Sequence, residues 1–140
     1  MRIDSTKPPP HALRPERQHQ LTDVPIVHTL YVTYRLWHDL VLKFPKSERY
    51  ALGQTCGQTL LAILERILAA AGIADRIQKL EHLRLVSTKL DILRLLVRLC
   101  KDTRCISNEA YLAVESKLHE TGRMLGGWIK SLSGTDNGRL

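Results

Sequence analysis

Apolar residues recur at helical spacing through most of the chain, and the longest such stretch runs from Asp75 to Lys101 without a proline or glycine. Its apolar positions alternate between three and four residues apart, which predicts the core-facing side of an α-helix. A second apolar stripe lies beside the first, and a helix with two such stripes needs two neighbours. The first stripe consists of Leu83, Val86, Leu90, Leu93, Val97 and Cys100, and the second of Leu85, Ile92, Leu96 and Leu99.

Three further segments, at about 24–43, 48–71 and 108–132, follow the same helical pattern. The connections between the four segments are short, which predicts an all-α, up-down-up-down antiparallel four-helix bundle. The predicted inward positions are Val27, Leu30, Tyr31, Tyr34, Trp37 and Val41 in the first of the three, Tyr50, Leu61, Leu64, Leu68 and Ala71 in the second, and Tyr111, Val114, Leu118, Thr121, Leu125, Trp128 and Leu132 in the third.

The two ends of the chain differ in composition from this apolar pattern. Residues 1–22 contain four prolines among polar residues, and such a segment buries too little surface to offset its ordering entropy. We therefore expect a disordered, proline-rich basic arm at 1–22, the bundle at 23–132 and a flexible tail at 133–140. Ser47 is expected to cap the second helix, whereas Ser107 or Asn108 should cap the fourth.

The positive net charge of the chain limits the kinds of partner that it is expected to bind. The formal net charge is +7 and the isoelectric point is near 9.6, which favours phosphates or acidic proteins. One cationic group shares the arc of the central helix that the apolar stripes leave free, and a second surrounds the turn before the second helix. We expect these residues to bind nucleic acid or a partner by charge and shape; the alternative is a solvated helix face. They are Arg76, Arg84, Arg94, Arg98 and Lys101, and Lys43, Lys46 and Arg49.

No constellation of residues indicates catalysis. The chain lacks a phosphate-binding loop, a nucleophile elbow and the HExxH pattern, and its carboxylates do not follow the di-iron bundle pattern. The three cysteines are not spaced for a zinc site. We therefore expect no catalytic residue, metal or cofactor. With no apolar run of about 18 residues, the chain is expected to be cytoplasmic.

Glycines interrupt two of the predicted helices at intervals of four residues. Gly53 and Gly57 stand in the second helix, and Gly122 and Gly126 in the fourth. An interior glycine costs a helix about 1 kcal/mol relative to alanine, so its use suggests a close approach by another helix. That helix could belong to the same chain or to another subunit.

Two motifs resemble a known family. The stretch from Phe44 to Gly53 reads FPKSERYALG and is similar to the hallmark of bacterial four-helix-bundle proteins that include those encoded in 23S rRNA intervening sequences. The stretch from Thr121 to Ile129 reads TGRMLGGWI and resembles the end of the accessory variability determinant (Avd) of diversity-generating retroelements. The likeness extends over about Val24 to Leu132.

This resemblance implies a homopentameric barrel that binds a reverse transcriptase and its template RNA and supports mutagenic cDNA synthesis without catalysis of its own. The alternative is a stand-alone structural or RNA-associated bundle of the rRNA intervening-sequence type, without a polymerase partner. A third hypothesis, an enzyme whose site forms between subunits, is weaker. The residues expected to serve assembly or packing are Gly53, Gly57, Gly122, Arg123, Gly126, Gly127 and Trp128.

Overall fold

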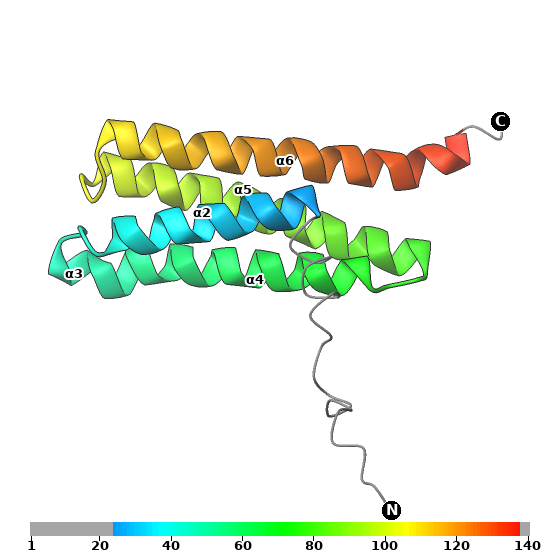
Figure 1. Cartoon of the computed structure of the whole chain (residues 1–140), viewed down its shortest axis with the longest axis horizontal. Coiled ribbons are helices and arrows are strands. Elements are labelled where there is room, and N and C mark those ends of the chain that lie inside the picture. Colours follow the sequence, from blue (N-terminus) through cyan, green and yellow to red (C-terminus); the bar gives the residue numbers. More distant parts are fainter. Residues whose placement is uncertain (1–23, 138–140) are drawn as a thin grey trace, which may run out of the picture.

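The computed structural model describes residues 24–137, and within that range all regular structure is helical. Four long helices form the body of the molecule, and α2 packs against α4 and α6 while α5 packs against the same two helices from the other side (Figure 1). The predicted four-helix bundle is therefore confirmed. The elements are α2 (Pro25–Val41), α3 (Lys46–Glu48), the π-helical segment η1 (Arg49–Gly53), α4 (Gln54–Ala71), α5 (Arg76–Asp102) and α6 (Asn108–Asn137).

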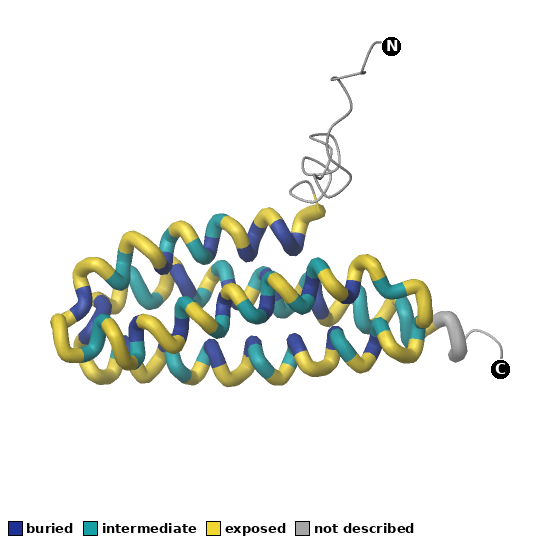
Figure 2. The backbone as a smooth tube through the Cα atoms, turned by 90° about the horizontal axis from the view of Figure 1, so that it is seen from below, coloured by how far each residue is buried: buried dark blue, intermediate teal, exposed yellow. Residues whose placement is uncertain are grey.

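The core lies along the axis of the bundle, where the buried positions of the four helices face one another (Figure 2). In α5 every residue of the first apolar stripe is buried, as predicted. In α6 the heptad pattern is also confirmed, because Val114, Leu118, Thr121 and Leu125 are buried. The second stripe of α5 behaves differently: Leu85, Ile92 and Leu99 are about half exposed and face neither α4 nor α6 closely enough to be covered.

The predicted inward stripe of the second helix was wrong by one residue. The buried residues of α4 are Cys56, Leu60, Ile63, Ile67 and Ala70. Most of the predicted positions follow these by one place, and Tyr50, which anchored that prediction, is 70% exposed. In α2, Tyr31 was also assigned inward wrongly, since Thr29 and Thr33 take the buried positions on either side of it.

The π-helical segment explains part of this error. A π-turn closes an i→i+5 hydrogen bond and thus shifts the register of all following residues relative to an α-helix. The indole Nε1 of Trp37 donates to the carbonyl of Gly53 at 3.0 Å, inside the core. A Cβ on Gly53 would lie 2.5 Å from Val41 Cγ2 and 3.2 Å from Phe44. The close approach predicted for Gly53 is thus real, and it is made within the chain.

Side-chain caps mark the N-terminal ends of two helices. Asp75 caps α5 by accepting from the N–H of Gln78 at 3.4 Å, and Ser107 caps α6 by accepting from the N–H of Ala110 at 3.1 Å. The prediction for Ser47 was wrong, because α3 begins after Pro45 and Ser47 lies inside it without a capping bond. α6 continues to Asn137, beyond the point where we placed the tail. The proposed arm at 1–22 lies outside the described residues.

Candidate nucleic-acid interface

The cationic edge of α5 lies along the seam with α6. Arg76 donates to the carbonyl of Leu132 at 2.9 Å. Arg94 forms two hydrogen bonds with Glu115 Oε1, at 2.9 Å from Nε and 2.6 Å from Nη2. These contacts join α5 to α6, so part of the predicted binding edge also serves packing.

The remaining cations of this edge are more accessible. Arg84 is exposed, and Arg98 lies 3.9 Å from Asp102 with about two thirds of its side chain exposed. Lys101 places its ammonium 4.8 Å from the ring centroid of Tyr111, a cation–π contact with the first turns of α6. Such exposed pairs contribute little to stability, so these side chains can exchange their contacts for a ligand at low cost.

The second predicted cluster lies at the turn between α2 and α3. Lys43 and Lys46 are exposed, and within residues 24–137 no carboxylate forms an ion pair with either. Arg49 instead donates to the carbonyl of Leu42 at 2.8 Å and holds the turn in place. Two of the three residues are thus free to contact a partner, while the third supports them.

The fold brings part of each predicted cluster to one end of the bundle, since Lys101 near the end of α5 lies at the same end as Lys43 and Lys46, whereas Arg76 lies at the start of α5. The turn after α2 and the loop between α5 and α6 lie at the same end (Figure 1). We call Lys43, Lys46, Lys101 and Arg104 the cationic end. A cavity of about 620 Å³ opens there, with apolar side chains beside three of these cations. Its lining consists of Leu40, Lys43, Lys101, Arg104, Cys105, Ile106, Ser107, Asn108 and Ala110.

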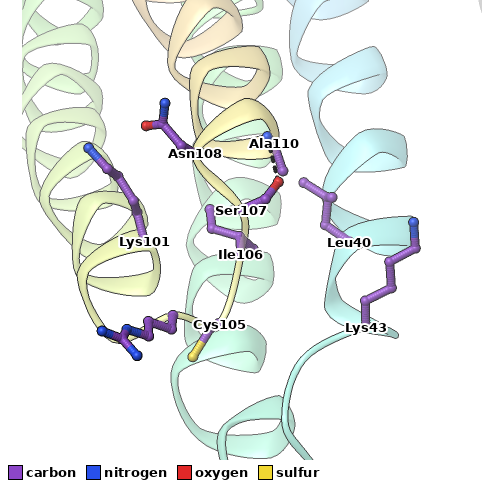
Figure 3. Close-up of a pocket in the computed structure, with 9 residues that line it drawn as sticks. Leu40, Lys43, Lys101, Cys105, Ile106, Ser107, Asn108 and Ala110 are labelled. Carbon is purple, nitrogen blue, oxygen red and sulfur yellow. Dashed lines mark hydrogen bonds between the residues drawn. The ribbon is translucent and has the colours of Figure 1, made fainter.

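The cations stand around this cavity and do not meet at one point. Lys101 reaches up from α5 on one side of the loop at 105–107, and Lys43 extends from the end of α2 on the other (Figure 3). Ile106 and Ser107 lie between them, where the loop enters α6. The arrangement can therefore contact several phosphates of one extended ligand, and its apolar centre can contact an uncharged part of the same ligand.

Arg104 is a functional candidate that the sequence analysis missed. It follows the end of α5 with φ of 63°, and it is the one non-glycine residue with positive φ among those described. Its N–H donates to the carbonyl of Lys101 at 3.0 Å, while the N–H of Cys105 donates to that of Cys100 at 2.8 Å. This is a Schellman motif, in which glycine is usual at the position of Arg104. In the sequence, the feature that could have indicated this site is an arginine just after the end of a predicted helix, at a position where glycine is usual.

Carboxylates near the cationic end do not neutralise it. None lines the cavity, although Glu109 stands in the first turn of α6 and is exposed. Asp102 pairs with Arg98 on the outside of α5. The cavity is therefore lined by cations and neutral groups alone.

The glycines of α6 lie beside a different groove. Gly122 and Gly126 line a cavity of about 270 Å³ between α5 and α6, together with Asp91, Arg94 and Arg123. A Cβ on Gly126 or Gly127 would meet no atom within 4 Å, whereas Gly122 faces Leu90 at 3.5 Å. Gly57 in α4 faces the ring of Trp37 at 3.6 Å and packs within the chain. Only part of the predicted assembly set is thus exposed.

The exposed apolar stripe of α5 is the second surface feature. Leu85, Ile92, Leu95 and Leu99 are each at least 46% exposed, and their spacings of seven, three and four residues place them on one face of the helix. Single exposed leucines are ordinary on a protein surface, whereas these four residues lie on one helix face and together form a larger exposed apolar patch. Arg84 and Arg98 stand beside this stripe.

The described residues contain no arrangement typical of an active site or a metal site. No group of three or more His, Cys, Asp or Glu side chains among residues 24–137 could hold a metal ion. Cys56 and Cys100 are buried with their sulfur atoms 4.0 Å apart, and the hydrogen bond with Cys56 together with burial raises the pKa of the Cys100 thiol. That thiol stays protonated and unreactive at neutral pH. Among the described residues no helix is both long and apolar enough to span a bilayer.

Comparison with known proteins gives one informative result. A family model described as bAvd-like matches residues 26–132, which covers the bundle from the first turn of α2 to most of α6. The curated proteins include no match to the chain. The matched range includes both cationic clusters, the exposed stripe of α5 and the glycines of α6.

Proposed function

This chain belongs to the bAvd-like family, and from that premise we propose that it is a non-catalytic accessory protein of a diversity-generating retroelement. In this role it binds the reverse transcriptase and the template RNA, and it supports mutagenic cDNA synthesis without taking part in the chemistry. The observation that carries the proposal is the cationic end of a bundle that matches the family model over residues 26–132. RNA is the partner that we assign to that end.

Electrostatics supports this assignment. Lys43, Lys46 and Arg104 have no carboxylate partner within the described part of the chain, so their charge is available to phosphates. Cationic side chains that contact phosphates release counterions, and this term supplies most of the affinity for nucleic acid without sequence readout. The bundle carries no groove-reading helix, so we expect recognition by charge and shape.

Self-association is the second part of the proposal. The exposed stripe of Leu85, Ile92, Leu95 and Leu99 supports contact with further copies of the chain, and the likeness to Avd supports a pentamer. If this stripe is the contact between copies, Ile92→Glu should yield monomers with unchanged helix content. Analytical ultracentrifugation of both proteins tests the point; an unchanged oligomer in the variant would place the contact elsewhere.

The proposed function is tested by RNA binding across a salt series. Wild type is compared with the double variant Lys46→Glu, Arg98→Glu, whose two side chains are exposed and lie outside the cavity. Wild-type affinity should fall steeply with salt, and the variant should bind more weakly with a shallower slope. Absence of RNA binding by the wild type at physiological salt would contradict the proposal.

Binding to the reverse transcriptase is tested in a separate experiment. If a reverse transcriptase gene lies beside this one, its product should be captured by the immobilised protein and should synthesise more cDNA in its presence. Binding of RNA without any capture of the polymerase would favour the alternative, a stand-alone RNA-associated bundle of the rRNA intervening-sequence type. The two results distinguish these functions without reference to the cavity.

A further inference from the structure

The cavity at the cationic end combines two properties that a phosphate-binding surface alone does not need. It is recessed between α2, the loop at 103–107 and the first turn of α6, and its volume is about 620 Å³. Its interior presents Leu40, Ile106 and Ala110, while Lys43, Lys101 and Arg104 supply positive charge. A surface that only attracts phosphates would gain nothing from an apolar recess.

We infer that this cavity holds a single-stranded segment of nucleic acid, with one base in the apolar recess and the flanking phosphates on Arg104 and Lys101 on one side and on Lys43 on the other. The inference rests on the proposed function for its choice of nucleic acid as the ligand. It adds the site, the strandedness of the ligand and the residues that contact it.

The placement of the cations determines the type of ligand. Lys43 and Lys101 line the cavity from opposite sides of the loop (Figure 3). This placement suits successive phosphates of one extended strand. A base that enters the recess must be unpaired, because a paired base is stacked and hydrogen-bonded inside the duplex and exposes only its edges. The site therefore selects single strands over duplexes.

The backbone at Arg104 has a fixed conformation that is unusual for an arginine, so the presence of this residue calls for an explanation. A left-handed conformation is unfavourable for a residue other than glycine, and the Schellman hydrogen bonds hold Arg104 in it. Arg104 forms neither a salt bridge nor a side-chain hydrogen bond with another described residue. Contacts within the described part of the chain therefore do not explain why an arginine occupies this position. Contact with a ligand phosphate does explain it.

The test compares a short single-stranded RNA with a duplex of the same length and sequence, by fluorescence anisotropy across a salt series. Arg104→Asn removes the charge but suits the left-handed backbone, since asparagine adopts it more readily than arginine. Ala110→Leu fills the recess and leaves the charge unchanged. Arg35→Gln is the matched control, because it removes one exposed cation of α2 that belongs to neither predicted cluster and lies outside the cavity.

We expect the wild type to bind the single strand more tightly than the duplex. Arg104→Asn should lower single-strand affinity about fivefold and reduce the salt slope by about 0.7, the change for one lost phosphate contact. Ala110→Leu should abolish the preference for single strands while leaving the slope unchanged. Arg35→Gln should leave the ratio of the two affinities as in the wild type.

Three results would overturn the inference, and they differ from failure of the proposed function. If Arg104→Asn weakens single-strand binding no more than Arg35→Gln, or if folded Ala110→Leu keeps the preference, RNA binds elsewhere and the proposed function stands. If ATP binds in an Arg104-dependent manner while RNA binding ignores Arg104, the cavity takes a free nucleotide. If no RNA binds the wild type, the proposed function fails and this inference with it. Should Ala110→Leu not fold, Arg104→Asn still decides.

Discussion

The two ends of the bundle differ in how they are packed. At the cationic end the turn after α2 is held by Trp37, Phe44 and Gly53, with the two rings edge to face at a centroid distance of 5.6 Å. At the other end α2 begins at Pro25, without a side-chain cap, while α5 and α6 extend further along the axis. An apolar cavity of about 410 Å³ remains there, lined by Val24, Pro25, Ile26, Ala71, Met124 and Trp128.

The two ends therefore differ in how rigidly they hold the side chains that they expose. The cationic end presents charge to solvent on a base of fully buried aromatic packing, so its side chains are displayed from a fixed frame. The apolar end exposes hydrophobic side chains on a frame with fewer closing contacts. A site that must position several cations at once requires the first arrangement, which is why we place the nucleic acid there.

Truncation of a tryptophan at each end gives the largest contrast. Trp37→Ala should lower the free energy of unfolding by about 3–5 kcal/mol, because it removes a fully buried ring and leaves the Gly53 carbonyl without its donor. Trp128→Ala, at the half-open end, should cost about 1 kcal/mol. Urea unfolding monitored by circular dichroism measures both. Equal losses would mean that the two ends are packed alike.

A Cβ added to a glycine at each end should act in opposite directions. Gly53→Ala should destabilise the fold by about 1–3 kcal/mol, because its Cβ would overlap Val41, which is branched and stiff. Gly127→Ala meets open space and should stabilise α6 by up to about 1 kcal/mol.

The same unfolding assay includes the pair Gly53→Ala, Val41→Ala as a control. The double variant should be less destabilised than the sum of the single changes, since truncation of Val41 removes the overlap. Strict additivity would show that the close contact is not the cause. If Gly127→Ala folds but loses self-association, the glycine face of α6 is part of the contact between copies.

Arg104→Gly should make the protein more stable and weaken its binding of RNA. Glycine adopts positive φ without steric cost, so the free energy of unfolding should rise by about 1 kcal/mol. Thermal unfolding of this variant beside Lys46→Gly, which replaces a cation with negative φ at the first residue of α3, tests the assignment. A gain in stability for both variants, or for neither, would contradict the backbone argument.

The smallest effect concerns the buried thiols. Because the pKa of Cys100 is raised in the folded state, the unfolded chain loses the thiol proton first as pH rises. Stability from this group is complete below the pKa of the thiol in the unfolded chain, about 8.5, and declines as pH rises above it. Cys100→Ala should show a shallower decline in urea midpoints over this range. Identical slopes would mean that the thiol ionises equally in both states.

The fold could be predicted from sequence because helical periodicity alone specifies it where the helices are regular. The first stripe of α5 and the heptads of α6 lie in uninterrupted helices, and both were predicted correctly. The inward face of α4 was not, since Tyr50 lies in a π-helical segment whose register no apolar pattern reveals.

The candidate site could be predicted only in parts. Lys43 and Lys101 were identified as cations, but their convergence on one cavity depends on the antiparallel packing that brings the turn after α2 beside the loop before α6. Arg104 was missed because a Schellman motif is ordinarily signalled by glycine. That Arg76 and Arg94 reach across to α6 could not be inferred from the pattern of a single helix.

The π-helical segment also means that the number of residues, as well as their identity, sets the core. A π-turn contains one more residue than an α-turn, so the stretch at Arg49–Gly53 accommodates one extra residue without unwinding the helix. Loss of a single codon there, such as the one for the exposed Ala51, would turn every preceding residue by about 100° relative to Gly53. The chain would stay helical, yet the partner of Trp37 would be displaced.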